Sequence, residues 1–200
     1  MPLPALAQGG PICERCDLTL NFTDTMASGF LYCPHCRQPL ETIELGGFPR
    51  GVCPDRHCGF IHWNNPTPVV AAVVEHRGGL VLARNVQWPA GTFALVTGFL
   101  EQAEDPAAAA AREVEEELGL RATQPPQLIG HYPFDRQNQL IIAYHVRAEG
   151  EIVLNEELAE WRHVPFAEVT YWPRATGLAL RDWLRGRGYD PQEAPLPLRS

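Results

Sequence analysis

The feature that most constrains this chain is a helix-forming segment whose two ends are both marked in the sequence. Asp105 precedes Pro106, which is typical of a helix start, because the carboxylate accepts from free backbone amides and proline's fixed φ suits the first helical position. Five alanines follow at 107–111, and alanine is the best helix former. Gly119 can adopt the left-handed conformation that ends helices. A helix is therefore predicted from about Pro106 to Leu118.

Three glutamates share one face of this predicted helix. Glu113, Glu116 and Glu117 are spaced i, i+3 and i+4, so their carboxylates lie within about one turn. Like charges at these spacings repel, and clustered hard oxygen ligands suit Mg²⁺ or Mn²⁺, which also hold phosphate oxygens. The alternative is a solvated acidic helix face. The surrounding residues favour the metal site, because Gly98, expected in a turn before the helix, and Arg112 fall at fixed offsets from the glutamates.

Six cysteines form a second pattern. They occur as three close pairs, which are Cys13 and Cys16, Cys33 and Cys36, and Cys53 and Cys58. Paired cysteines in a chain without a secretion signal indicate zinc rather than disulfides. Four thiolates complete a tetrahedral structural site, which also stabilises a segment too small to fold on its own core. Spacing alone allows two sets, the first four cysteines or the last four.

The composition along the chain predicts four parts. Residues 1–10 are rich in Pro and Gly and are expected to be flexible, 11–64 form the cysteine module, 65–189 form the main domain, and 190–200 form a flexible, Pro-rich tail. Strands are expected over 69–75, 80–84, 92–96 and 140–146, with a hairpin turn at 76–79. A second helix is expected over 176–185. This mixture indicates an α/β domain.

The fixed spacing around the predicted helix resembles the Nudix box, Gly-x5-Glu-x7-Arg-Glu-U-x-Glu-Glu-x-Gly-U with U apolar. Every position is filled, by Gly98, Glu104, Arg112, Glu113, Val114, Glu116, Glu117, Gly119 and Leu120. The segment from Tyr32 through Asn65-Pro66 is similar to the zinc ribbon that precedes the Nudix domain in the NADH pyrophosphatase group. The resemblance implies an α/β/α sandwich with a small N-terminal zinc ribbon. It also implies that Zn²⁺ is held by the second and third pairs, Cys33, Cys36, Cys53 and Cys58.

The resemblance further implies a metal-dependent hydrolase. Its substrate is a nucleoside diphosphate linked to another group, X, and its products are a nucleoside monophosphate and phospho-X. Carried over by position, Glu113, Glu116 and Glu117 hold Mg²⁺ or Mn²⁺, with the Gly98 carbonyl as a possible further ligand.

Three residues are catalytic candidates on the same grounds. Arg112 is expected to orient a carboxylate rather than touch substrate, and Glu116 is an alternative general base. Glu157 resembles a downstream family position where a glutamate binds metal or serves as base; the alternative is a surface carboxylate.

The substrate is less well defined by the sequence. NADH pyrophosphatases carry Ser-Gln-Pro-Trp-Pro-Phe-Pro after the box, whereas this chain retains only the Pro133-Phe134 core. Phe134 and Trp88 are candidates for stacking on a base or ribose, and ordinary packing is the alternative for each. The favoured substrates are dinucleotides such as NADH, NAD⁺, ADP-ribose or FAD. Nucleoside triphosphates or RNA caps are the alternative, and a ligand-sensing zinc-ribbon regulator is a third hypothesis that the intact box disfavours.

Charge and hydropathy restrict the partners. The net charge is −8, all sixteen cations are Arg, and residues 1–62 hold four Arg against six acidic residues, so binding to nucleic-acid backbones is not expected. A small nucleotide remains the expected partner. The longest strongly apolar stretch, 69–74, is too short to cross a membrane, and no targeting signal is evident, so a cytoplasmic location is expected. A homodimer is a further expectation, by analogy with the resembling group.

Overall fold

The computed structural model describes residues 30–194, and the chain forms two compact units that meet between Asn64 and Asn65. The first unit contains a three-stranded antiparallel sheet in the order β1 (Glu41–Leu45), β2 (Phe48–Val52) and β3 (Ile61–His62). Gly46 and Gly47 join β1 to β2 with φ angles of 64° and 80°, which glycine adopts without steric cost. The predictions for residues 1–10, Cys13, Cys16 and 195–200 lie outside the described residues.

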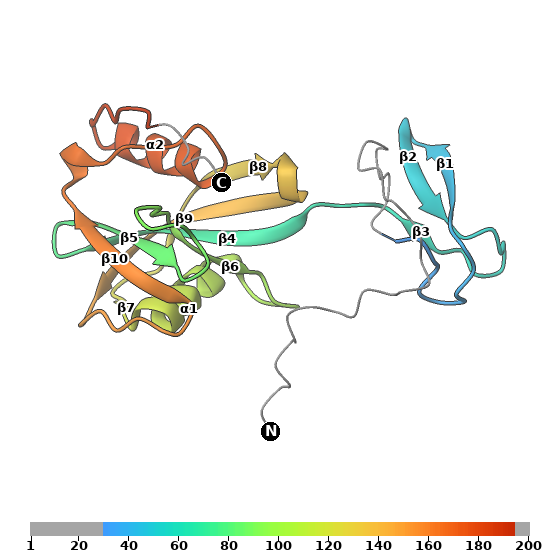
Figure 1. The fold of residues 1–200 in the computed structure, drawn as a ribbon, viewed down its shortest axis with the longest axis horizontal. Helices are drawn as coiled ribbons and strands as arrows, with labels where there is room; N and C mark the ends of the chain where they lie inside the picture. Colours follow the sequence, from blue (N-terminus) through green and yellow to red (C-terminus); the bar gives the residue numbers. More distant parts are fainter. Residues whose placement is uncertain (1–29, 195–200) are drawn as a thin grey trace, which may run out of the picture. The chain divides into compact units, whose positions relative to one another are not determined.

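The second unit is built on one mixed sheet (Figure 1). Its strands follow the order β10-β5-β4-β9-β7, with β6 paired to β4 and β8 paired to β9. Only the β4–β9 pair is parallel among the strand pairs described for this sheet. The strands are β4 (Thr67–His76), β5 (Gly79–Asn85), β6 (Val96–Phe99), β7 (Arg121–Ala122), β8 (Gln127–Phe134), β9 (Gln139–Glu149) and β10 (Leu158–Val164). Two short 3₁₀ helices are η1 (Asp135–Gln137) and η2 (Phe166–Glu168).

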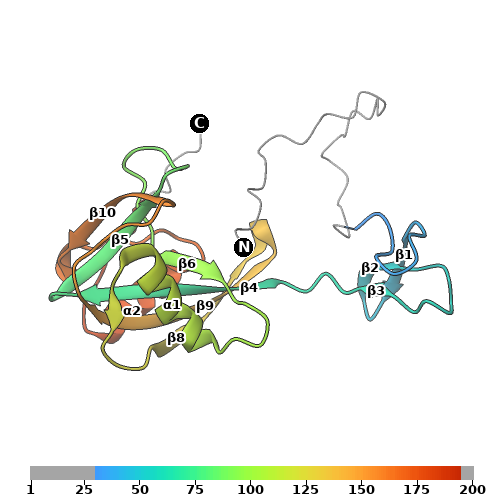
Figure 2. The same ribbon diagram turned by 90° about the horizontal axis from the view of Figure 1, so that it is seen from below.

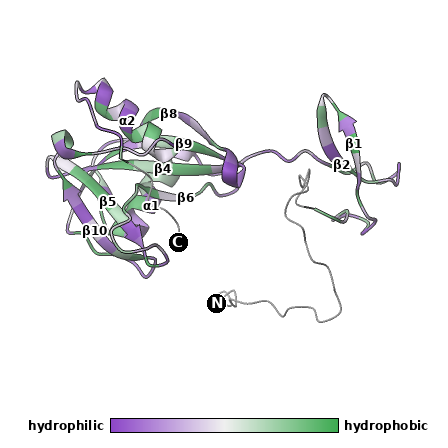
Figure 3. Ribbon diagram, turned by 45° about the horizontal axis from the view of Figure 1, so that its top comes forward, coloured by the Kyte–Doolittle hydropathy of each residue, from purple (hydrophilic) through white to green (hydrophobic). Residues whose placement is uncertain are grey.

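A helix covers each face of this sheet, α1 (Pro106–Leu118) on one side and α2 (Thr176–Gly186) on the other (Figures 1 and 2). The apolar run in β4 serves both faces, because successive side chains of a strand point to opposite sides. Val70, Ala72 and Val74 join the core beneath α1. The residues that alternate with them, Val69, Ala71 and Val73, join the cores beneath α2. Figure 3 shows β4 as largely hydrophobic between these helices. The α/β/α sandwich is therefore confirmed.

Most of the predicted elements are present. The two helices begin where expected, and the hairpin between β4 and β5 turns at Arg77 and Gly78, whose φ angles are both positive, 47° and 80°. Three predicted strands lie within β4, β5 and β9. In the described residues, neither helix has the length and apolar character that a membrane span requires.

Two local predictions were wrong. The strand expected at 92–96 begins instead at Val96, because Ala94 makes one isolated bridge to β5 before the chain changes partner to β4. Gly98 is therefore not in a turn but inside β6, opposite Val70, and the turn before α1 lies at residues 102–103. Neither error displaces the helix.

The tail predicted to be flexible from residue 190 is hydrogen-bonded to the domain at its start. The backbone N–H of Tyr171 donates to the carbonyl of Gln192 at 3.0 Å, and that of Ala194 donates to the carbonyl of Tyr171 at 2.8 Å. The Tyr171 hydroxyl also donates to the carboxylate of Glu193 at 2.9 Å. These hydrogen bonds extend the ordered domain to Ala194, since a paired backbone loses the freedom of a loose tail.

Candidate active site

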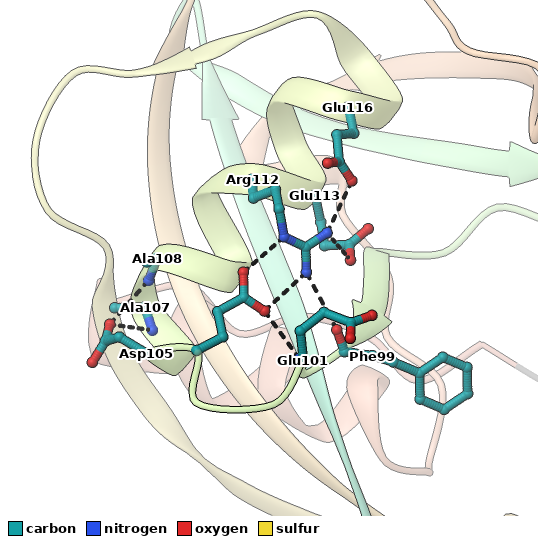
Figure 4. Close-up of polar contacts among 9 residues, drawn as sticks. Phe99, Glu101, Asp105, Ala107, Ala108, Arg112, Glu113 and Glu116 are labelled. Atoms are coloured by element: carbon teal, nitrogen blue, oxygen red, sulfur yellow. Dashed lines mark hydrogen bonds and ion pairs between the residues drawn. The ribbon is translucent and has the colours of Figure 1, made fainter. Parts of the chain in front are cut away.

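Helix α1 is fixed at both ends by the residues that mark it in the sequence. One oxygen of Asp105 accepts from the backbone N–H groups of Ala107 and Ala108, both at 3.0 Å (Figure 4). Gly119 has a φ of 68°, and its N–H donates to the carbonyl of Glu115 at 2.9 Å. Because both ends satisfy otherwise free backbone groups, the register of the helix is set, and so are the positions of its glutamates.

Strand β6 approaches α1 closely at Gly98. The carboxylate of Glu113 lies over the α-carbon of Gly98, where a β-carbon would come within 1.9 Å of Glu113 Cδ. A real β-carbon cannot occupy that space, so the contact requires glycine. The sequence marked Gly98 correctly as an important position, but the reason is this contact rather than a turn.

Arg112 binds acidic residues of α1 and of the loop before it (Figure 4). Its guanidinium donates to both oxygens of Glu104, at 2.7 and 3.1 Å, to Glu113 at 2.8 Å and to Glu116 at 2.9 Å. A fifth bond runs to the carbonyl of Phe99 at 3.3 Å. These five bonds use all five guanidinium N–H groups, so Arg112 binds protein groups and keeps three carboxylates in place.

Glu104 supports this arrangement from the loop before the helix. Its carboxylate also accepts from the backbone N–H of Glu101 at 3.1 Å. Hydrogen bonds from Arg112 and from that amide lower the pKa of Glu104, so this side chain is a fixed negative charge beside the guanidinium.

Glu117 is the most unusual carboxylate in the cluster, because it is only 7% exposed. Burial, followed by the charges of Glu113, Glu157 and Glu116 in that order, raises its pKa to about 8. Burial also raises the pKa of Glu113, although Arg112 opposes the shift. Concentrated negative charge of this kind is poorly solvated, and a bound cation would relieve it. The oxygen donor set fits Mg²⁺ or Mn²⁺.

A small pocket of about 60 Å³ opens beside Glu117. That volume is several times what one water molecule needs. Glu157 and Trp88 line the same pocket, so residues far apart in the sequence meet there. Glu157 is exposed in the loop before β10, and its carbonyl accepts from the N–H of Val86 at 2.8 Å. Phe134, in contrast, packs against the apolar cluster under α2 that contains Val69 and Ile141.

The sequence did not indicate two polar residues that also line the pocket. Asn85 ends β5 and Thr97 belongs to β6. The only local clue is at Asn85, whose side-chain oxygen accepts from the N–H of Gln87 at 2.9 Å, as in an Asx turn. Nothing in the sequence indicated Thr97, because the strand that contains it was predicted at 92–96, too early in the chain.

The four predicted zinc ligands come together in the first unit. The sulfurs of Cys33, Cys36, Cys53 and Cys58 all lie within 4.8 Å of one another. The closest pairs, Cys33 with Cys58 and Cys36 with Cys53, are 3.5 and 3.4 Å apart, well beyond a disulfide bond of about 2.05 Å. Four sulfurs bound to zinc at about 2.3 Å are separated by about 3.8 Å, so the donor set and its spacing fit Zn²⁺.

The two cysteine loops end in the same backbone conformation. Each closing cysteine is followed by a residue in the left-handed conformation, Arg37 with φ 65° and Gly59 with φ 66°. The thiols differ, however. Although burial opposes ionisation of Cys33, hydrogen bonds from the Cys36 and His35 amides lower its pKa to about 7, while burial raises the pKa of Cys53 to about 12. A thiol such as Cys53 needs a metal to lose its proton near neutral pH.

Together, the fold and these sites define a class of protein. It is an α/β/α sandwich domain in which one helix presents clustered glutamates beside a pocket, preceded by a four-cysteine module. A family model described as NUDIX domain matches residues 65–185, more than half of the chain. The chain therefore belongs to the NUDIX domain family.

Curated relatives agree with this assignment. The chain is 30% identical over 144 residues to the NAD-capped RNA hydrolase NudC of Stutzerimonas stutzeri (strain A1501), a match covering 70% of this chain and 50% of that protein. It is 32% identical over 146 residues to human NAD-capped RNA hydrolase NUDT12, covering 67% of this chain and 31% of that one. Mouse mitochondrial NAD(P)H pyrophosphatase NUDT13 is 26% identical over 133 residues, with 66% and 37% covered. The chain thus spans half or less of the length of these relatives.

The fold is shared with a solved structure. A NUDIX hydrolase from Nitrosomonas europaea superimposes with a TM-score of 0.65 at 23% identity, covering 83% of this chain and 97% of that one.

Proposed function

We propose that this protein is a metal-dependent diphosphate hydrolase acting on a nucleoside diphosphate linked to another group, most readily a dinucleotide such as NADH, NAD⁺, ADP-ribose or FAD. The observation that carries the proposal is the burial of Glu117 among three further carboxylates beside a pocket, within a NUDIX domain. Such crowding destabilises the metal-free protein and suits a site where a cation and a phosphorylated ligand complete the charge balance.

In this proposal Glu113, Glu116 and Glu117 hold Mg²⁺ or Mn²⁺, with the Gly98 carbonyl as a further ligand. The bound metal would polarise phosphate oxygens and acidify water. Water adds to one phosphorus, the bridging P–O bond breaks, and a nucleoside monophosphate and phospho-X leave. Arg112 acts by orienting Glu113 and Glu116 rather than by touching substrate.

Glu157 is our preferred general base. It lines the pocket with Glu117, whereas the other candidate, Glu116, is hydrogen-bonded to Arg112. In this role the Glu157 carboxylate takes the proton of the attacking water, which then adds to phosphorus as hydroxide.

Trp88 is the aromatic residue best placed to contact the substrate, because it lines the pocket that contains Glu117. The names of the relatives support a dinucleotide diphosphate, since NAD-capped RNA and NAD(P)H both contain one. NAD-capped RNA is therefore a second candidate substrate. The net charge of −8 and the absence of lysine argue against long contacts with an RNA backbone.

The four-cysteine cluster is proposed to hold one structural Zn²⁺, which the matched loops and sulfur spacing support. A homodimer and a cytoplasmic location stay predictions from the sequence.

The direct test is product analysis. Purified protein with Mg²⁺ or Mn²⁺ is incubated with NADH, NAD⁺, ADP-ribose, FAD, nucleoside triphosphates and a short NAD-capped RNA, and the products are separated by chromatography. AMP with the matching phospho-partner from a free dinucleotide, or nicotinamide mononucleotide with 5′-phosphorylated RNA from the capped RNA, supports the proposal and identifies the substrate. No turnover by folded, zinc-loaded protein would contradict it and favour the ligand-sensing alternative.

Replacing Gly98 by alanine is expected to lower kcat by roughly ten- to a hundredfold, because the added methyl must displace the Glu113 carboxylate and small misplacements in a site have effects of that size. Steady-state kinetics at saturating metal measures the change. Gly186→Ala is the matched control, since nothing lies within 4 Å of a β-carbon there. Unchanged kcat in a folded Gly98→Ala variant would show that Glu113 need not occupy its present position.

Metal affinity is expected to rise with pH up to about 8. Glu117 has a raised pKa, so the metal-free fold binds a proton that the unfolded chain has lost above its lower pKa. Its contribution to stability is therefore full below the unfolded pKa and is lost as pH rises through about 8. Mn²⁺ must displace this proton, so calorimetric titration at pH 6 should give weaker binding than at pH 8. Equal affinities at the two pH values, once the heat of buffer protonation is subtracted from the titration, would mean that Glu117 is not a ligand.

A further inference from the structure

The wall of the pocket that carries Trp88 is a short turn bound by a partly buried arginine. The turn spans Asn85 to Trp88, with the N–H of Trp88 donating to the carbonyl of Asn85 at 3.0 Å. Arg84, whose side chain is 14% exposed, precedes this turn on β5. Its guanidinium donates to the carbonyl of Trp88 at 2.9 Å and to the carboxylate of Glu160 at 2.8 Å. One side chain therefore connects the turn to the neighbouring strand.

Strand β10, which carries Glu160, is irregular. Glu160 pairs with Arg84 and Leu158 pairs with Asn85, so the register shifts between Leu158 and Glu160 and Ala159 forms a bulge. A bulge bends a strand and re-aims the residues beside it. Here it lies next to Glu157 and Leu158, which line the pocket together with Asn85 and Trp88 of the turn. The Arg84–Glu160 pair thus adds a side-chain link between β5 and β10 where the ladder is broken, beside the backbone bond from the Val86 N–H to the Glu157 carbonyl.

We propose that Arg84 is a positioning residue that holds Trp88 against the substrate by binding its carbonyl oxygen and Glu160. This inference rests on the proposed function, in which Trp88 touches the substrate. Arginine suits the role because its planar group can reach two acceptors at once, whereas the single ammonium of lysine is held less precisely. A partly buried charge bound to a carboxylate and a carbonyl also keeps its geometry better than an exposed pair does.

The kinetic test is a double-mutant cycle on Arg84 and Trp88. Trp88→Ala is expected to raise KM roughly tenfold, which corresponds to the binding free energy of about one aromatic contact. Arg84→Ala is expected to raise KM roughly fivefold. In each variant kcat should stay within about twofold of the wild-type value. The double variant should match Trp88→Ala alone, because Arg84 acts through Trp88. Arg84→Lys should recover part of the affinity. Arg77→Ala is the control, since Arg77 forms an exposed pair with Glu151 on another turn.

Additive effects in the double variant, or a loss of kcat without a change in KM, would overturn the inference. Thermal unfolding checks that each variant folds; if Arg84→Ala does not, Glu160→Gln weakens the same connection with a smaller change and takes its place.

Hydrogen exchange separates this inference from the proposed function. Amides of Val86 to Trp88 should exchange severalfold faster in Arg84→Ala than in wild type, while those of β4 stay unchanged. This result is independent of turnover, so it decides the role of Arg84 even if no tested nucleotide is hydrolysed. Unchanged exchange in the turn would show that Arg84 does not hold it.

Discussion

Replacing Glu117 by glutamine is expected to reduce kcat on the order of a thousandfold while leaving the domain folded. The change removes a proposed metal ligand without altering the size of the side chain, and a metal contributes several kcal/mol of transition-state stabilisation. Steady-state kinetics over a range of Mn²⁺ concentrations, together with direct metal titration, measures the loss.

The same variant should be at least as stable as wild type when metal is absent. Glu117 is buried among like charges, so the metal-free wild-type fold must take up a proton that the unfolded chain has lost at neutral pH, a cost that the neutral glutamine does not carry. The matched control is Glu115→Gln on the same helix, because Glu115 is exposed and pairs only loosely with Arg121 at 3.4 Å. Near-wild-type turnover by folded Glu117→Gln protein would refute the metal assignment.

Replacing Cys53 by serine is expected to remove the zinc and unfold the first unit. This unit holds a three-stranded sheet with little buried apolar surface, and the buried residues described in it include Cys33 and Cys53 themselves. A segment of this kind depends on its metal, since zinc supplies about 10–16 kcal/mol of apparent binding free energy in comparable small domains. Elemental analysis should fall from about one zinc per chain toward zero.

Hydrogen exchange then locates the damage. Amides of β1 and β2 should lose protection, whereas those of β4 should keep it, because the second unit has its own core. Cys13→Ser is the control and should retain zinc. The opposite pattern, with zinc kept in Cys53→Ser and lost in Cys13→Ser, would assign the site to the first four cysteines.

The residues around Gly98 show what the sequence patterns could predict and what they could not. The box positions identified Gly98, Arg112 and Glu113 together, yet their geometric reason was not visible, because the close approach of Gly98 to Glu113 joins a strand to a helix. The misplaced strand at 92–96 has a similar cause. Its residues suit a strand, but where pairing begins depends on which neighbour offers a ladder, and β4 does so only from Val96 onward.

The aromatic candidates make the same point. Trp88 and Phe134 were both candidate substrate contacts from the sequence, although a loop-edge or core role is the commoner one for a residue such as Trp88. The structure places Trp88 beside Glu117 and packs Phe134 against the core under α2. Arg84 had no pattern to mark it, because its acceptors lie on a turn and on another strand.

The sequence by itself determined helix α1, the spacing of its glutamates and the paired cysteine loops. Each depends on interactions within a few residues, such as the Asp105 cap and the Gly119 end, which local patterns encode. Only the tertiary structure shows how closely the sulfurs of the last four cysteines approach, how deeply Glu117 is buried, and that Glu157 and Trp88 share its pocket. Those features depend on strand pairing and packing between distant segments, and a carboxylate's environment exists only after that packing is complete.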